Sequence, residues 1–152
     1  CSVGTGGTLA GTSAYLKEKN PDIKIVLADP MGSALYNWVT TGEAVMTPGP
    51  SMTEGIGNSR VTQNLATATI DEAVQVDDQE MVNMVYRLLH QEGWFFGSSS
   101  GINLGAAVKI AKELGPGHTI VTILCDDGGK YQSRLYNPAF LAERDLAVPS
   151  FA

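Results

Sequence analysis

The chain has 152 residues, of which 43% are hydrophobic and 17% charged, so we expect a globular protein with a core and not a disordered one. Ten basic and sixteen acidic residues give a net charge of −6 with no basic run, which argues against a nucleic-acid partner. No apolar stretch approaches the ~20 residues that cross a membrane. The two cysteines, Cys1 and Cys125, make no disulfide framework, and with no signal-peptide pattern we expect a cytoplasmic protein.

Helix-like and strand-like patterns alternate through the first half of the chain. Residues 8–19 predict a helix that ends at Asn20-Pro21. Residues 23–28 are apolar and β-branched, which predicts a buried strand. A short helix is expected within residues 32–41. Residues 44–69 have little periodicity, and a loop of that length inside a compact domain is usually functional.

The same alternation continues in the second half. The best-marked helix covers residues 77–91, because Asp77 and Glu80 have capping-box spacing and Gly93 follows the last apolar position. The strongest strand pattern is the apolar run at residues 118–125. The remaining expected elements are strands at 73–76 and 94–97 and helices at 102–114 and 138–144.

Strands that alternate with helices predict an α/β fold, with a mainly parallel sheet covered by helices on both faces in three layers. The length fits a single domain over residues 1–152. In such sheets ligands bind at the carboxyl ends of the strands. The glycine-rich and serine-rich loops of this chain all fall at expected strand-to-helix turns.

The first of these loops has the features of a phosphate site. Glycines allow successive backbone N–H groups to approach an anion, and the start of a helix adds a favourable dipole. A plain turn and a dinucleotide site are the alternatives. The dinucleotide pattern fits poorly, because its third glycine falls on Leu9, although Asp29 stands where a ribose-binding acid would. The loop consists of Gly4, Thr5, Gly6, Gly7 and Thr8.

Three further loops carry polar groups. The serines of residues 97–101 either cap a helix or hydrogen-bond a neutral ring nitrogen. Glycines at residues 54–57 could bring backbone close to a ligand. The acids that open residues 126–131 favour a solvated turn, because no third ligand accompanies them and no metal site is expected. His90 and His118 are expected to be structural, and Cys125 to lie in the core.

These loops, in this order, resemble those of fold type II pyridoxal-phosphate enzymes, and most closely the cysteine synthase (O-acetylserine sulfhydrylase) family. Four motifs in register carry the resemblance over nearly the whole chain. They are VGTGGTLAG at 3–11, EGIGNSRVTQNL at 54–65, GSSSGIN at 97–103 and GPGHTIVTILCDDGGKYQSRLYNPAFL at 115–141. The resemblance implies pyridoxal 5′-phosphate as the cofactor and a small amino acid as the substrate.

The resemblance also implies roles for individual residues. The loop from Gly4 to Thr8 would hold the cofactor's 5′-phosphate. Ser99 would face the pyridine nitrogen, with Ser100 as the alternative. The backbone of Gly55, Ile56 and Gly57 would lie near the substrate's amino group, and Asp126 and Tyr131 would surround the ring-nitrogen side.

One essential group of the family has no counterpart here. The family attaches its cofactor to a lysine in the N-terminal half, whereas none of the six lysines of this chain has the buried setting that such chemistry requires. No loop for a substrate carboxylate is visible either. We therefore interpret residues 1–152 as the C-terminal, cofactor-binding part of a longer enzyme whose N-terminal half is absent, with no catalytic residue of its own.

The implied parent activity is β-replacement on an activated serine, in which O-acetylserine and sulfide give cysteine and acetate. Cystathionine β-synthase, or another β-replacement or elimination enzyme of the same fold type, is the alternative within the class. A non-catalytic module that binds a phosphate ligand is the alternative outside it. We expect the isolated chain to be inactive, its missing half to be its partner, and the complete enzyme to be a homodimer.

Overall fold

The computed structural model describes residues 1–151 and divides them into two compact units. The first unit consists of Cys1–Ser51 with Gly55–Gln75, and the second of Met52–Glu54 with the chain from Val76 onward. Each unit is described by itself below. The prediction of one domain over residues 1–152 stays a prediction.

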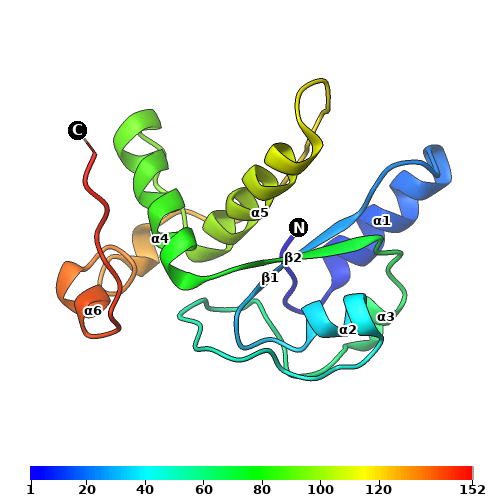
Figure 1. The fold of residues 1–152 in the computed structure, drawn as a ribbon, viewed down its shortest axis with the longest axis horizontal. Helices are drawn as coiled ribbons and strands as arrows, with labels where there is room; N and C mark the ends of the chain where they lie inside the picture. The colour runs from blue at the N-terminus through cyan, green and yellow to red at the C-terminus, as the bar shows by residue number, and fades with distance from the viewer. Residues whose placement is uncertain (152) are drawn as a thin grey trace. The chain divides into compact units, whose positions relative to one another are not determined.

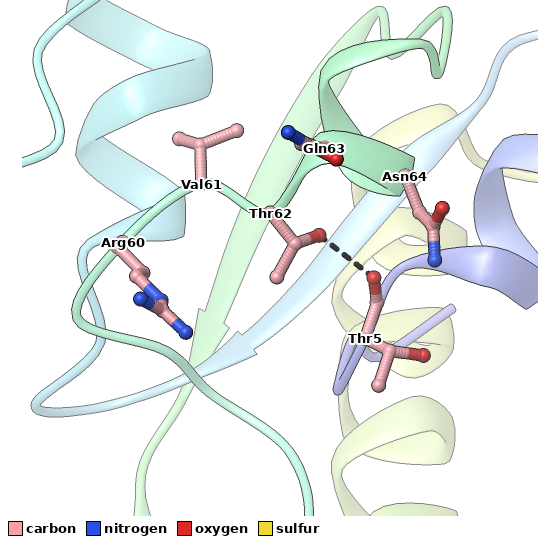
Figure 2. Close-up of a pocket in the computed structure, with 6 residues that line it drawn as sticks. All are labelled: Thr5, Arg60, Val61, Thr62, Gln63 and Asn64. Carbon is pink, nitrogen blue, oxygen red and sulfur yellow. Dashed lines mark hydrogen bonds between the residues drawn. The ribbon is translucent and has the colours of Figure 1, made fainter.

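The first unit is an α/β arrangement around a parallel pair of strands. The strands β1 (Val26–Pro30) and β2 (Glu72–Val76) are neighbours and run in the same direction (Figures 1 and 2). An isolated parallel bridge adds Ser2 beside Ala28 of β1. The α/β class with a parallel sheet is thus confirmed. The helices of this unit are α1 (Gly7–Lys19), α2 (Leu35–Thr41) and the short α3 (Gln63–Ala66), which was not predicted.

Apolar side chains on both sides of β1 form the core of the first unit. Leu27 and Ala28 are both buried, as expected for a strand that is covered on each face. The predicted strand at residues 23–28 is thus present, although hydrogen bonding places it a few residues later. The buried cluster around it contains Val3, Leu9, Ile25, Leu27, Leu35 and Leu65.

The second unit is helical. Its helix α4 (Asp78–Arg87) begins at the predicted capping box, in which Asp77 accepts from the Glu80 N–H at 2.8 Å and Glu80 accepts from the Asp77 N–H at 3.0 Å. The other elements are the π-helix η1 (Leu88–Glu92), α5 (Ser98–Leu114), the 3-10 turn η2 (Gly129–Tyr131) and α6 (Pro138–Ala142).

Two glycines allow α5 to approach its neighbours closely. A Cβ on Gly101 would lie 2.8 Å from Val85 Cγ1 and 3.0 Å from the Met81 carbonyl oxygen of α4, and one on Gly105 would lie 2.9 Å from Val76 Cγ1. Because real Cβ atoms essentially never come so close, a larger residue would separate these elements. Met81 and Val85 of α4, which have no exposed surface, therefore pack against the glycine face of α5.

The strand predicted at residues 118–125 is wrong for this structure. No strand is assigned there, and Val121 is 87% exposed. Cys125 is also exposed, which corrects its predicted place in the core. An apolar extended segment becomes a buried strand only when other strands pair with it, and within residues 1–151 no strand lies beside this one.

Two smaller predictions also need correction. The segment 94–97 contributes only an isolated antiparallel bridge between Phe96 and Asp127, instead of a strand. The serines expected to precede a helix at residue 102 form its first turn, since α5 begins at Ser98. Among the helices of residues 1–151, none is both long and apolar enough to cross a membrane.

Candidate functional site

The glycine loop, residues 4–8, leads directly into α1. Gly6 is the residue before the helix and has φ 88°, in the left-handed region that favours glycine. A Cβ on Gly6 would also lie 2.8 Å from the backbone nitrogen of Leu65. Within the described chain no side chain caps the first turn of α1, so the N–H groups there remain available. This arrangement fits an anion, as predicted from the sequence.

The glycine loop lies against the second predicted loop. A Cβ on Gly4 would overlap the carbonyl oxygen of Gly55, and the Gly57 N–H donates to the Val3 carbonyl at 2.9 Å. The side-chain amide of Asn58 donates to the Gly4 carbonyl. The structure therefore brings together residues 4–8 and residues 55–57, which the sequence analysis had assigned to one site.

A pocket of about 480 Å³ opens beside Thr5 (Figure 2). On one of its walls the Thr62 hydroxyl donates to the Thr5 carbonyl at 2.7 Å. Arg60 is the charged member of the lining, and no ion pair of Arg60 is present within residues 1–151. The lining consists of Thr5, Arg60, Val61, Thr62, Gln63 and Asn64.

The other predicted site residues lie in the second unit, at the start of α5. Ser99 is 6% exposed, and Ser100 is fully buried and accepts from the Cys125 N–H at 2.9 Å. Ser98 is 2% exposed, and its hydroxyl oxygen has no hydrogen-bond partner among the described residues. The available hydroxyl thus belongs to Ser98, whereas the resemblance implied that role for Ser99, with Ser100 as the alternative.

Asp126 and Tyr131 lie together beside that helix start. The Tyr131 hydroxyl donates to Asp126 Oδ2 at 2.9 Å, and Lys130 forms an ion pair with the same oxygen. Burial, followed by the hydrogen bond to Asp126, raises the pKa of the Tyr131 phenol above its ordinary value. The other carboxylate oxygen, Oδ1, is buried and has no partner within the described part of the chain.

Gly97 permits this arrangement. A Cβ there would overlap both Asp126 Oδ1 and the ring of Tyr131, and the Gly97 N–H donates to the Asp126 carbonyl at 3.0 Å. The start of α5 therefore collects two buried polar oxygens without partners in the described chain, on Ser98 and Asp126. Such atoms are costly unless another group bonds them, which fits a ring-nitrogen environment.

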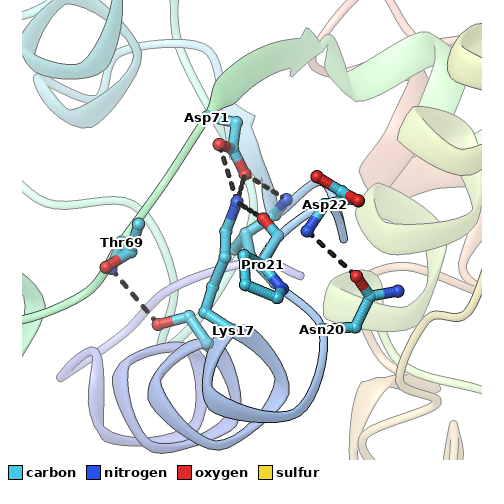
Figure 3. Close-up of polar contacts among 8 residues, drawn as sticks. Lys17, Asn20, Pro21, Asp22, Thr69 and Asp71 are labelled. Carbon is cyan, nitrogen blue, oxygen red and sulfur yellow. Dashed lines mark hydrogen bonds and ion pairs between the residues drawn. The ribbon is translucent and has the colours of Figure 1, made fainter.

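None of the six lysines is buried. Lys17 is the least exposed and is held by Asp71 at 2.8 Å and by the Pro21 carbonyl at 3.3 Å (Figure 3). Because Asp71 also accepts from the Ile25 N–H at 2.7 Å, Lys17 serves to join the end of α1 to the sheet. Lys19, Lys109 and Lys130 form ion pairs with neighbouring acids, and Lys24 and Lys112 are not buried.

Asp29 is a buried carboxyl at the end of β1. Its Oδ2 accepts from the Tyr36 N–H at 2.8 Å, at the start of α2, and its Oδ1 has no partner among residues 1–151. Burial raises its pKa to about 6. A side chain with no exposed surface is unable to hold a ribose, so this residue does not support the dinucleotide alternative.

No group of three His, Cys, Asp or Glu side chains that could hold a metal ion occurs within residues 1–151. His90 stacks on Tyr86 with ring centroids 6.3 Å apart and packs against Phe151, which is a structural environment. The groups placed for chemistry are therefore the uncapped glycine loop in the first unit and the start of α5 in the second.

Comparison with known proteins identifies relatives of this chain in sequence and in fold. A cysteine synthase of Dictyostelium discoideum is 45% identical over 97% of this chain, and an O-acetylserine dependent cystathionine beta-synthase of Bacillus subtilis is 39% identical over 86%. The crystal structure of an O-acetylserine dependent cystathionine beta-synthase from Helicobacter pylori superposes with a TM-score of 0.75 at 34% identity, covering 88% of this chain and 41% of that one.

The chain spans about two fifths of the length of these relatives, 41% of the Dictyostelium protein and 40% of the Bacillus protein. The family described as "Pyridoxal-phosphate dependent enzyme" matches residues 1–126, which include the glycine loop, the loop at residues 55–57 and the start of α5. The chain thus belongs to the family of pyridoxal-phosphate-dependent enzymes.

Proposed function

We propose that this chain is the cofactor-binding part of a cysteine synthase. In that reaction the bond between Cβ of O-acetylserine and its ester oxygen breaks and acetate leaves, while a bond forms between Cβ and the sulfur of sulfide to give cysteine. The observation that carries the proposal is the glycine loop, whose N–H groups at the start of α1 have no side-chain cap in the described chain. The 42–45% identity to four cysteine synthases supports the choice of reaction.

The residues of this chain would bind and orient the cofactor. Residues 4–8 would bind the 5′-phosphate by backbone N–H groups and the hydroxyls of Thr5 and Thr8. The start of α5, with Ser98, Ser99 and the carboxylate of Asp126, would face the ring nitrogen. The backbone of residues 55–57 would lie near the substrate's amino group. Pyridoxal phosphate itself, when bound, supplies an electron sink that acidifies the proton on the substrate's Cα.

The lysine that bonds the cofactor would come from the rest of the enzyme. Each lysine of this chain is unburied or paired with an acid, so none has a setting that favours the neutral amine. We therefore propose that the chain alone is inactive and that its partner is the remainder of the same protein. Strands of that remainder would pair with the apolar segment at residues 118–125.

The test is a β-replacement assay on two samples. The 152-residue chain alone is expected to make no cysteine from O-acetylserine and sulfide, and the full-length enzyme that contains it is expected to make cysteine. Cysteine formation by the chain alone would overturn the proposed division of roles. Full-length enzyme that accepts homocysteine in place of sulfide would favour the cystathionine β-synthase alternative, which the Bacillus relative supports.

A phosphate-binding module without catalysis predicts a different pattern. Such a module would bind inorganic phosphate and pyridoxal phosphate equally well, and no longer form of the protein would be active. We also propose a homodimer and a cytoplasmic location for the complete enzyme. Sedimentation equilibrium and cell fractionation, respectively, test these two proposals.

A further inference from the structure

Two side chains donate hydrogen bonds to carbonyl groups of the glycine loop. The Asn58 amide donates to the Gly4 carbonyl, and the Thr62 hydroxyl donates to the next carbonyl, that of Thr5, at 2.7 Å (Figure 2). The two donors come from one short segment, residues 58–62. They engage two successive peptide groups at the point where the chain enters α1.

These contacts determine where the loop's N–H groups point. All peptide bonds of the described chain are trans, so each carbonyl lies opposite the N–H of the following residue. A Gly4 carbonyl fixed on Asn58 therefore turns the Thr5 N–H away from residues 58–62. A Thr5 carbonyl fixed on Thr62 does the same for the Gly6 N–H. Two donors are thus oriented just before the free N–H groups of α1.

Asn58 is itself held firmly. Its N–H donates to the Ser33 hydroxyl at 3.1 Å, and its carbonyl accepts from the Ala34 N–H at 2.7 Å. Its backbone is therefore tied to the residues that precede α2. Because its backbone is fixed, only the side-chain torsions of Asn58 remain to be ordered by the bond to Gly4, which lowers the entropic cost of that bond.

Thr62 is anchored by a second element. It is the N-cap of α3, where its hydroxyl accepts from the Leu65 N–H at 3.2 Å while it donates to Thr5. Leu65 is fully buried and lies against Gly6. The start of α3 thus contacts the residues that precede α1 at two points, through Thr62 on Thr5 and through Leu65 on Gly6.

We propose that Asn58 and Thr62 are positioning residues for phosphate binding. They hold the two carbonyl oxygens away from the anion, which these oxygens would repel, and so let the N–H groups converge on it. Neither side chain is assigned a contact with the phosphate. This inference rests on the proposed function of the glycine loop, because it concerns the direction of that loop's donors.

The test compares two ligands that differ only in the phosphate. Pyridoxamine phosphate and pyridoxamine lack an aldehyde, so neither bonds covalently to a lysine. Their dissociation constants are measured by fluorescence on the cofactor-free, full-length protein and on its Asn58→Ala, Asn58→Asp and Thr62→Val variants. Urea unfolding of each variant is measured in parallel.

The expected result is a loss that depends on the phosphate. Each substitution is expected to weaken pyridoxamine phosphate about tenfold, the change for about one hydrogen bond to a charged group, and to change pyridoxamine less than about twofold. Asn58→Asp is expected to be at least as weak as Asn58→Ala, because a carboxylate donates no hydrogen bond. Thr62→Ser keeps the hydroxyl and is expected to restore binding.

Matched controls remove the same kind of bond elsewhere in the first unit. The Asn37 amide donates to the Val45 carbonyl at 2.7 Å, and the Thr67 hydroxyl donates to the Asn64 carbonyl at 2.8 Å, both at exposed positions. Asn37→Ala and Thr67→Val are expected to leave both affinities unchanged. Comparable urea midpoints across the set would separate positioning from general loss of stability.

The outcomes distinguish the two proposals. If the wild-type protein binds both ligands equally, the proposed function of the loop fails and this inference fails with it. If the wild type prefers the phosphorylated ligand and the Asn58 and Thr62 variants keep that preference, only the inference is overturned. Equal loss of both ligands would likewise overturn it, because a merely structural role has no preference for phosphate.

Discussion

Two segments with the same sequence character have opposite surroundings in this protein. The strand β1 and the segment 118–125 are both rich in apolar residues. Asp29 lies near the end of β1, and Asp126 directly follows the other segment. Leu27 in β1 has no exposed surface, whereas Val121 is 87% exposed. The difference is one of partners, since β2 and Ser2 bond to β1, while no strand of residues 1–151 pairs with the other segment. A local pattern therefore specifies extended backbone, and only tertiary pairing specifies burial.

The largest expected effect is the difference between truncations in the two segments. Leu27→Ala removes a side chain from a closed core and is expected to lower the free energy of unfolding of the chain by about 2–5 kcal/mol. Val121→Ala is expected to change it by less than about 0.5 kcal/mol, because no burial is lost. Urea unfolding of both variants measures the two values. Equal losses would show that residues 118–125 are covered in solution.

The aspartates near the ends of the two segments allow a second comparison, of how stability depends on pH. Burial raises the pKa of Asp29 from 3.8 to about 6. Between these values the folded state holds a proton that the unfolded state has released, so the contribution of Asp29 to stability is fully present below pH 3.8 and is lost as the pH rises toward 6. At about 1.4 kcal/mol per pH unit, the loss above pH 6 is about 3 kcal/mol.

Asp29→Asn is expected to remove that decline, which urea unfolding between about pH 4 and about pH 7 would measure. The substituted amide would stay neutral throughout, and its oxygen would still accept from the Tyr36 N–H. Asp126→Asn is the matched control, since its carboxyl follows the other segment and is 30% exposed. A stability difference between the wild type and Asp29→Asn that stays constant across this range would contradict the raised pKa of Asp29.

The parts of the fold that were predicted correctly depend on neighbours in sequence. The start of α4 follows from Asp77 and Glu80, which bond each other three residues apart. The glycine loop is similar, because its left-handed Gly6 and the helix after it are local features. By contrast, the exposure of Cys125 was not predicted, because the run before it carries no sign of whether a strand pairs with it.

In the candidate site, too, the residues that were missed depend on partners that are distant in sequence. Asn58 and Thr62 were missed because their bonding partners, Gly4 and Thr5, lie 54 and 57 residues away. The one local signal was the polar run that follows the predicted glycines at residues 55–57. Ser98 was not chosen as the ring-nitrogen partner because capping and a ring-nitrogen bond were both open for these serines, and only the structure shows that its hydroxyl has no partner in the described chain.

A smaller effect is expected from replacing two glycines at α1 that differ in their surroundings. Gly6→Ala places a Cβ at φ 88° and 2.8 Å from Leu65, so it is expected to cost about 2–3 kcal/mol. Gly11→Ala, in the exposed middle of α1, meets nothing within 4 Å and is expected to stabilise the chain by about 0.5–1 kcal/mol. Thermal unfolding measures both. A stabilising Gly6→Ala would show that the loop is not held as described.

The smallest effect on stability is expected from a charge introduced into the exposed segment, residues 118–125. Val121→Lys is expected to change the free energy of unfolding by less than about 0.5 kcal/mol, since an exposed lysine stays hydrated. An unpaired apolar strand also favours pairing with another copy, and an added lysine opposes it. We therefore expect sedimentation velocity to show less concentration-dependent association for Val121→Lys than for the wild-type chain.

The control is Val108→Lys, which adds the same charge on α5, where Val108 is 39% exposed and the backbone is already bonded within the helix. Equal reductions by both variants would attribute the association to net charge alone. A reduction confined to Val121→Lys would show that free backbone groups at residues 118–125 drive it. The segment would then differ from β1 only in lacking a neighbouring strand, because its own residues already favour extended pairing.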